Sequence, residues 1–106
     1  MITLDELCAS LGARQTEVCG WIEAGFVEAA GESQSWRFAD VDAARVRLIF
    51  ELRYQMNVVE EDLDLVLRLL DQVYGLRREL QALAQAVSRQ PEAVRGAIAA
   101  AMKAGD

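Results

Sequence analysis

The fold of this chain is decided by residues 3–25, which read TLDELCASLGARQTEVCGWIEAG. Thr3 and Glu6 have the spacing of a capping box, which satisfies two backbone donors at a helix start, so a helix is predicted to begin at Thr3. The apolar residues that follow have helical spacing: Leu4, Leu7, Cys8 and Leu11. Gly12 then predicts a left-handed cap that ends this helix.

A second helix is predicted to begin at Gln15 and Thr16 and to run to Gly25, a second terminator. Its apolar residues are Val18, Cys19, Trp21 and Ile22. Two short helices joined by a tight turn near Gly12 have the outline of a helix-turn-helix.

The next segment predicts a small β-hairpin, or wing. Residues 26–28 and 36–38 are short aromatic or β-branched stretches on either side of a loop that contains glycine and serine. Asp40 is then a candidate N-cap for a third helix, which Asn57 is expected to end. The apolar residues of that helix are Val41, Ala44, Leu48, Phe50, Leu52 and Met56. Residues 1–57 are therefore predicted to be a winged helix-turn-helix domain.

Residues 58–90 have the pattern of a coiled coil. Apolar residues recur there at alternating steps of three and four, and we call this set the apolar seam: Val66, Leu69, Val73, Leu76, Leu80, Leu83 and Val87. Leu63, Leu67 and Leu70 widen the apolar face at the N-terminal end, where we expect the helix to pack on its own domain. An intramolecular core helix is the alternative, but little chain remains to cover so long a stripe. The seam therefore predicts a homodimer.

Pro91 interrupts the long helix, and residues 91–106 allow two readings. Proline in the first turn, followed by alanine-rich helical spacing, fits a last short helix. A frayed tail fits equally well. The fold class predicted from the whole pattern is mainly α, with a small hairpin wing.

Composition disfavours an enzyme. The 106 residues include no histidine, which excludes an imidazole base and a histidine-ligated zinc. No glycine-rich phosphate loop is present, and the only lysine is Lys103. We expect no cofactor and no metal. Cys8 and Cys19 are eleven residues apart among apolar neighbours, which favours buried structural thiols over a disulfide or a metal site.

Charge disfavours direct DNA binding. The chain has 11 basic and 17 acidic side chains, a net charge of −6. Residues 1–36 hold only Arg14 as a cation against six carboxylates, a net charge of −5. A DNA-reading helix needs cations for phosphates and Arg, Asn or Gln for base edges. Gln15 is the only residue of the predicted second helix whose side chain could hydrogen-bond to a DNA base edge.

The N-terminus has no basic segment followed by an apolar stretch, so no signal peptide is expected. No apolar run approaches the roughly 18 residues of a membrane span. We expect a cytoplasmic protein without a membrane partner.

The order of these segments resembles the MerR-type winged-helix layout, and within it the chaperone-modulator CbpM family. The likeness covers about residues 2–87, and these sequences carry it: ITLDELC at 2–8, EAGFVE at 23–28, SWRFAD at 35–40, LR at 52–53, LRLLD at 67–71 and LRREL at 76–80. The second helix of the DNA-binding MerR proteins carries a sequence similar to Arg-Tyr-Tyr-Glu. At the corresponding position, 19–22, this chain has Cys-Gly-Trp-Ile. Their wing carries Tyr-Arg-x-Tyr. In this chain Trp36 aligns with the arginine of that motif, and an alignment shifted by one residue would place Arg37 there instead. They also place effector-binding cysteines near the coiled coil, and nothing after Cys19 is cysteine, which disfavours metal sensing.

The resemblance implies a function on protein. Such a protein binds the J-domain of a CbpA-type DnaJ co-chaperone, occludes the surface that this domain offers to DnaK, and inhibits both co-chaperone activity and DNA binding by that co-chaperone. The second helix of a J-domain is basic because it engages an acidic DnaK surface, and an acidic competitor fits it. A MerR-like transcription factor that uses Arg45, Arg47 and Arg53, or a dimerisation module without a regulatory site, are the alternatives.

The predicted partner-binding residues flank the third helix and open the long helix, outside the seam. They are Asp40, Asp42, Arg47, Glu51, Arg53, Tyr54, Glu60, Glu61 and Asp64. The carboxylates that open the long helix also fit a solvated helix start that complements the helix dipole. Trp21, Trp36 and Phe38 are expected to be core residues of the winged domain.

Overall fold

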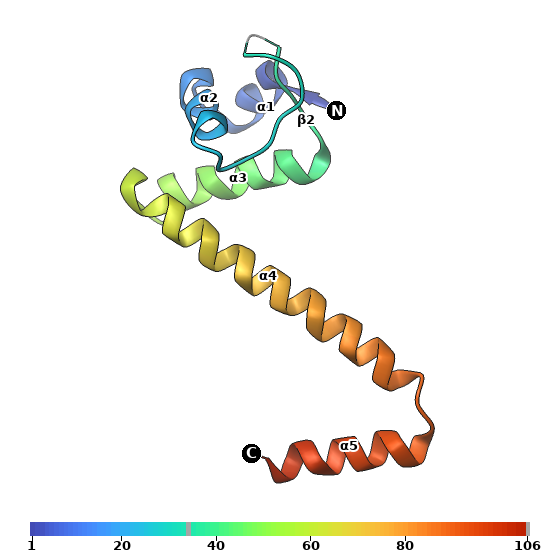
Figure 1. The fold of residues 1–106 in the computed structure, drawn as a ribbon. Helices are drawn as coiled ribbons and strands as arrows, with labels where there is room; N and C mark the ends of the chain where they lie inside the picture. Colours follow the sequence, from blue (N-terminus) through green and yellow to red (C-terminus); the bar gives the residue numbers. More distant parts are fainter. Residues whose placement is uncertain (34, 106) are drawn as a thin grey trace. The chain divides into compact units, whose positions relative to one another are not determined.

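The computed structural model describes residues 1–33 and 35–105 and is mainly helical (Figure 1). Gln34 of the predicted wing loop and Asp106 of the predicted tail lie outside the described residues. The chain divides into two compact units, Met1–Leu67 and Arg68–Asp106, which we call the N-terminal and C-terminal units. Every buried apolar residue in the described part lies at or before Leu67, so the core belongs to the N-terminal unit.

Helix α1 spans Leu4–Leu11, and both of its predicted ends are confirmed. The Glu6 backbone N–H donates to Thr3 Oγ1 at 3.2 Å, and the Thr3 hydroxyl donates to the Glu6 carboxylate at 3.1 Å. Gly12 adopts the left-handed conformation with φ 73°, and its N–H donates to the Cys8 carbonyl at 2.8 Å. A side chain there would meet a steric penalty that glycine avoids.

Helix α2 spans Gln15–Glu23 and completes the helix-turn-helix. Its N-cap is Arg14, without a side-chain hydrogen bond, and Gly25, with φ 81°, follows its end as predicted. Val18 and Trp21 are buried, and α2 packs on α1. The helix therefore turns its large apolar side chains inward.

The predicted pairing of the wing is wrong in part. Strand β2, Arg37–Phe38, forms an antiparallel pair with β1, Ile2–Thr3, and residues 26–28 form no strand. The predicted hairpin is reduced to one bridge between Ala30 and Arg37. Two facts explain this: Val27 is buried in the core, and Leu4 N–H donates to the Trp36 carbonyl at 3.1 Å, which ties the start of α1 to the strand.

Helix α3 spans Asp40–Tyr54, and its ends differ from the prediction. The N-cap is Ala39, without a side-chain hydrogen bond, and Asp40 is the first helical residue. Asp40 and Asp42 instead place negative charge in the first turn, where it complements the helix dipole. Met56 lies outside the helix and is 68% exposed. Asn57 does mark the break, with φ 58°.

Of the apolar residues that the sequence analysis named along α3, only Leu52 is buried. The buried residues are Ala43, Val46, Ile49 and Leu52. Val41 is 74% exposed, and Ala44 is exposed. Apolar residues occur almost all round this helix, so spacing alone allowed more than one face. Contacts with α1 and β2 select the buried one.

Helix α4 spans Glu60–Ser88, and α5 spans Glu92–Ala104. Leu63 and Leu67 are buried, which confirms that the start of α4 packs within the N-terminal unit. The tail is a helix from Glu92, which decides between the two readings of that segment. None of the described residues after Leu67 is buried.

Candidate functional site

The exposed side of α2 is polar and acidic. Gln15, Thr16, Gly20 and Glu23 are exposed along it, and the nearest cation along the chain is Arg14 at its N-cap. The last turn of α2 holds no basic residue. Because the C-terminal end of a helix carries partial negative charge, the Glu23 carboxylate adds to a field that is already negative.

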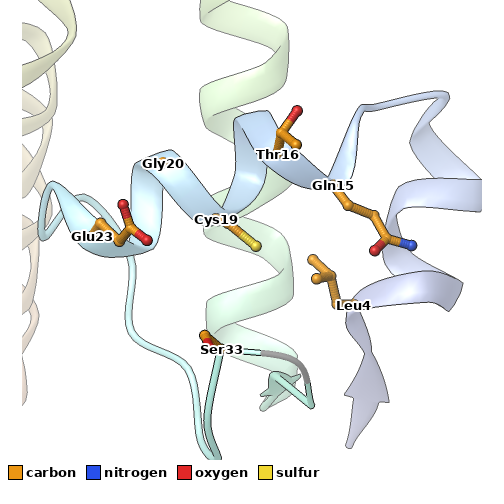
Figure 2. A pocket seen from close by; sticks show the side chains of 7 residues that line it. All are labelled: Leu4, Gln15, Thr16, Cys19, Gly20, Glu23 and Ser33. Atoms are coloured by element: carbon orange, nitrogen blue, oxygen red, sulfur yellow. The ribbon is translucent and has the colours of Figure 1, made fainter.

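A hollow opens on this side of α2, between the helix and the loop before β2. Its volume is about 460 Å³, and we call it the α2–loop hollow; it is lined by Leu4, Gln15, Thr16, Cys19, Gly20, Glu23 and Ser33. Figure 2 shows the Cys19 thiol and the Leu4 side chain pointing into it, with Gly20 and Glu23 further along the same helix. None of the lining residues is basic.

The two thiols have different surroundings. Cys19 is half-buried at the hollow, whereas Cys8 is buried, and neither forms a disulfide. Burial raises the pKa of the Cys8 thiol, and the neighbouring Cys19 and Asp5 raise it further. Cys8 is buried as predicted, whereas Cys19 is only half-buried, because it lies on the side of α2 that faces the hollow.

Glu60 links the start of α4 to the helix-turn-helix. Its Oε1 accepts a hydrogen bond from the indole N–H of buried Trp21 at 3.3 Å and lies 3.7 Å from Arg53 Nε. The second distance is an ion pair but too long for a hydrogen bond. Two of the predicted partner-binding residues, Arg53 and Glu60, thus contact each other within the chain.

Tyr54 is a third predicted residue with contacts inside the chain. Its hydroxyl donates to the Glu17 carboxylate of α2, and its ring lies 4.8 Å from the ring of Phe50. The Arg53 guanidinium lies over the same ring, 5.4 Å from its centre. The hydrogen bond to Glu17 raises the pKa of Tyr54, and partial burial contributes less. The C-terminal end of α3 is therefore joined to α2 and to α4.

The other predicted partner-binding residues lie on two sides of α3 and in the first turns of α4. Asp40, Arg47 and Glu51 share one exposed face of α3, because steps of seven and four residues return to the same side of a helix. Asp42 is half-buried on another side of that helix. Glu61 and Asp64 are exposed in the first two turns of α4, and Asp64 has a contact within the chain.

Five of the seven residues of the apolar seam are exposed: Leu69, Val73, Leu76, Leu80 and Leu83. Leu76, Leu80 and Leu83 are 58–64% exposed, whereas Val66 and Val87 at the two ends are half-buried.

The sequence did not predict the α2–loop hollow or the contact between Trp21 and Glu60. A buried tryptophan usually needs an acceptor for its indole N–H, which is a signal that such a contact exists. Thirty-nine residues separate the two partners, so that signal could not identify the acceptor. Trp36, expected in the core, is half-buried.

Neither a metal-binding cluster nor a membrane-spanning helix is found in residues 1–33 and 35–105. No cluster of three or more acidic or cysteine side chains there has the arrangement of a metal site. No helix in the same part has both the length and the apolar character needed to cross a bilayer.

Comparison with known proteins gave one match. A family model described as MerR HTH family regulatory protein matches residues 2–85, which include the helix-turn-helix, β2, α3 and most of α4. Searches of curated proteins and of solved structures found no match.

Proposed function

The chain belongs to the MerR helix-turn-helix family of regulatory proteins, and we propose that it uses this fold to bind a protein, the J-domain of a CbpA/DnaJ-type co-chaperone. In this proposal it is a chaperone modulator: it occludes the J-domain surface that engages DnaK and inhibits the co-chaperone, including its DNA binding. The resemblance to the CbpM family suggests the partner, and the charge of the helix-turn-helix supports it.

The observation that carries the proposal is the sign of the charge on α2. DNA binding depends on neutralising phosphates with Lys and Arg, so a reading helix must present cations. The exposed side of α2 presents Glu23 and polar neutral residues instead. Electrostatic complementarity then favours a basic partner and speeds its association.

Contacts inside the chain reduce the number of predicted partner-binding residues that are suitable for testing. Glu60, Arg53 and Tyr54 already contact other residues of the N-terminal unit, so substituting them disturbs the fold as well as a surface. Glu51 and Glu61 are exposed, and no ion pair with another described residue involves either side chain. They are the better residues for testing a partner face on α3 and α4.

We further propose that the protein forms a homodimer, in which the apolar seams of two chains pack against each other. The exposure of Leu76, Leu80 and Leu83 along one side of α4 supports this, because knobs-into-holes packing between two helices buries such a stripe. Two winged domains per dimer would then present two partner sites.

Calorimetry with an isolated J-domain tests the proposal. The full chain is expected to bind, with an affinity that falls as salt rises, because charge complementarity contributes to association. A second assay measures DnaK ATPase stimulation by the full co-chaperone, which the chain is expected to inhibit. No heat of binding at low salt would contradict the proposal.

A DNA-binding transcriptional regulator is the alternative function. The family match through α2 and β2 favours it, and Arg37 is exposed on β2. An electrophoretic mobility shift at low ionic strength separates the two functions, because non-specific DNA affinity is strongest there. A shifted band at low salt would support the alternative, and an acidic dimer that leaves DNA unshifted is not a DNA reader.

A further inference from the structure

Helix α2 contains two residues that oppose helix stability, and both line the α2–loop hollow. Gly20 lies in the middle of the helix, and glycine is among the least favourable helix formers. Glu23 places a negative charge at the negative end of the helix dipole. Residues that are unfavourable for local structure are expected mainly at functional sites.

The structure gives no internal reason for Gly20. A Cβ added there would meet no atom within 4 Å, and the residue does not adopt a positive φ. Packing within the chain therefore does not require glycine at this position. Its effect is to leave the backbone of α2 open to close approach beside Cys19 and Glu23 (Figure 2).

The negative charge of Glu23 is likewise not balanced by a nearby cation in the described part of the chain. No ion pair or hydrogen bond with another described residue involves its side chain, and no basic residue lines the hollow. The remaining polar groups are the amide of Gln15 and the hydroxyls of Thr16 and Ser33. Gln15 and Thr16 lie at the opposite end of α2 from Glu23, so the groups suited to a cation at the Glu23 end are its carboxylate and the helix C-terminus beside it.

We propose that the α2–loop hollow receives a lysine or arginine side chain of a basic protein partner. This inference rests on the proposed function and locates its contact on α2, the helix that faces the major groove in DNA-reading helix-turn-helix proteins. The Glu23 carboxylate pairs with the inserted cation, and Gly20 lets the partner backbone approach. The volume, about 460 Å³, lies at the lower end of the range of ligand pockets and suits a side chain.

The first test compares two charge reversals in the full-length chain. Glu23→Lys is expected to weaken binding of the J-domain at least tenfold more than Glu92→Lys, which makes the same change of net charge on exposed α5. Equal losses in the two variants would overturn the inference and leave the proposed function intact, because both variants reduce long-range attraction alike.

The second test uses two alanine substitutions. A Cβ meets nothing at either Gly20 or Gly75, so Gly20→Ala and Gly75→Ala are both expected to raise the urea midpoint. Only Gly20→Ala is expected to weaken J-domain binding, at least fivefold. A Gly20→Ala chain that is more stable and binds the J-domain as tightly as wild type would contradict the proposal that the partner backbone approaches α2 closely at Gly20.

The third test needs no J-domain, so it separates this inference from the proposed function. Argininamide is titrated into ¹⁵N-labelled full-length chain at millimolar concentration. The amide signals of Cys19, Gly20 and Glu23 are expected to shift in wild type and to stay unchanged at 19 and 20 in Glu23→Gln. Absence of shifts in wild type would overturn the inference, whereas J-domain binding is measured separately.

Discussion

Met1–Leu67 and the chain from Arg68 onward contain similar apolar side chains but place them differently. In the first unit Leu7, Phe38 and Ile49 are fully buried, whereas in the second Leu76, Leu80 and Leu83 remain 58–64% exposed. The first unit covers its apolar residues with its own chain. The second leaves an apolar stripe exposed, and because the proposed dimer would cover it, the stability of that unit is expected to depend on protein concentration.

The largest effect is expected from emptying the core of the first unit. Phe38→Ala removes a fully buried ring and leaves a cavity, which should lower the free energy of unfolding by about 3–5 kcal/mol. Urea denaturation at several protein concentrations measures this. The loss should be the same at all of them, and a loss that disappears at high concentration would place Phe38 in an interface between chains.

The second effect is expected in the other unit. In the proposed dimer, Leu76→Asp together with Leu80→Asp should raise the dissociation constant at least about 100-fold, or about 2.7 kcal/mol, because two charges would enter the seam between the two helices. Light scattering should then give the monomer mass. Val41→Asp, at an exposed position of α3, is the control. An unaltered dimer mass in the double variant would place the interface elsewhere.

A smaller effect is expected at the start of helix α4, within the first unit. Glu60→Ala removes the acceptor of the buried Trp21 indole and the charge opposite Arg53, and should cost about 1–2 kcal/mol. Glu61→Ala, one residue further and exposed, should change stability by less than about 0.5 kcal/mol. Equal urea midpoints for the two variants would show that the Trp21 contact contributes nothing.

The smallest effect depends on pH. The hydrogen bond to Glu17 raises the pKa of Tyr54, so it stabilises the neutral phenol of the folded chain. That stability is present below the unfolded pKa of about 10 and is lost as the pH rises through the folded pKa. The difference in melting temperature between wild type and Tyr54→Phe should therefore shrink above pH 10. A difference that does not change between pH 8 and pH 11 would mean that the phenol proton is not involved.

The two regions also differ in how far the sequence predicted them. Local signals were sufficient for α1, where Thr3 and Gly12 act within one turn of the helix ends, and for the long helix, where the seam repeats. Signals between distant residues were not sufficient. The pairing of β2 with β1 joins residues 36 positions apart, Ile2 and Phe38 being partners, whereas the sequence suggested the nearer hairpin.

The candidate site shows the same limit. The acidic character of α2 could be predicted, because charge is read directly from the residues. The hollow could not, because Leu4, Cys19 and Ser33 come from three separate segments that only the folded chain brings together. The internal contacts of Glu60 and Tyr54 were missed for the same reason.

Cys19 gives the protein a built-in chemical reporter. It is half-buried at the α2–loop hollow, whereas Cys8 is buried with a raised pKa and is therefore the less reactive thiol. A maleimide dye added to the unmodified chain should label Cys19 first and so place a probe at the proposed contact without any substitution. A bound partner should slow that labelling, so mass spectrometry could follow occupancy of the hollow over time.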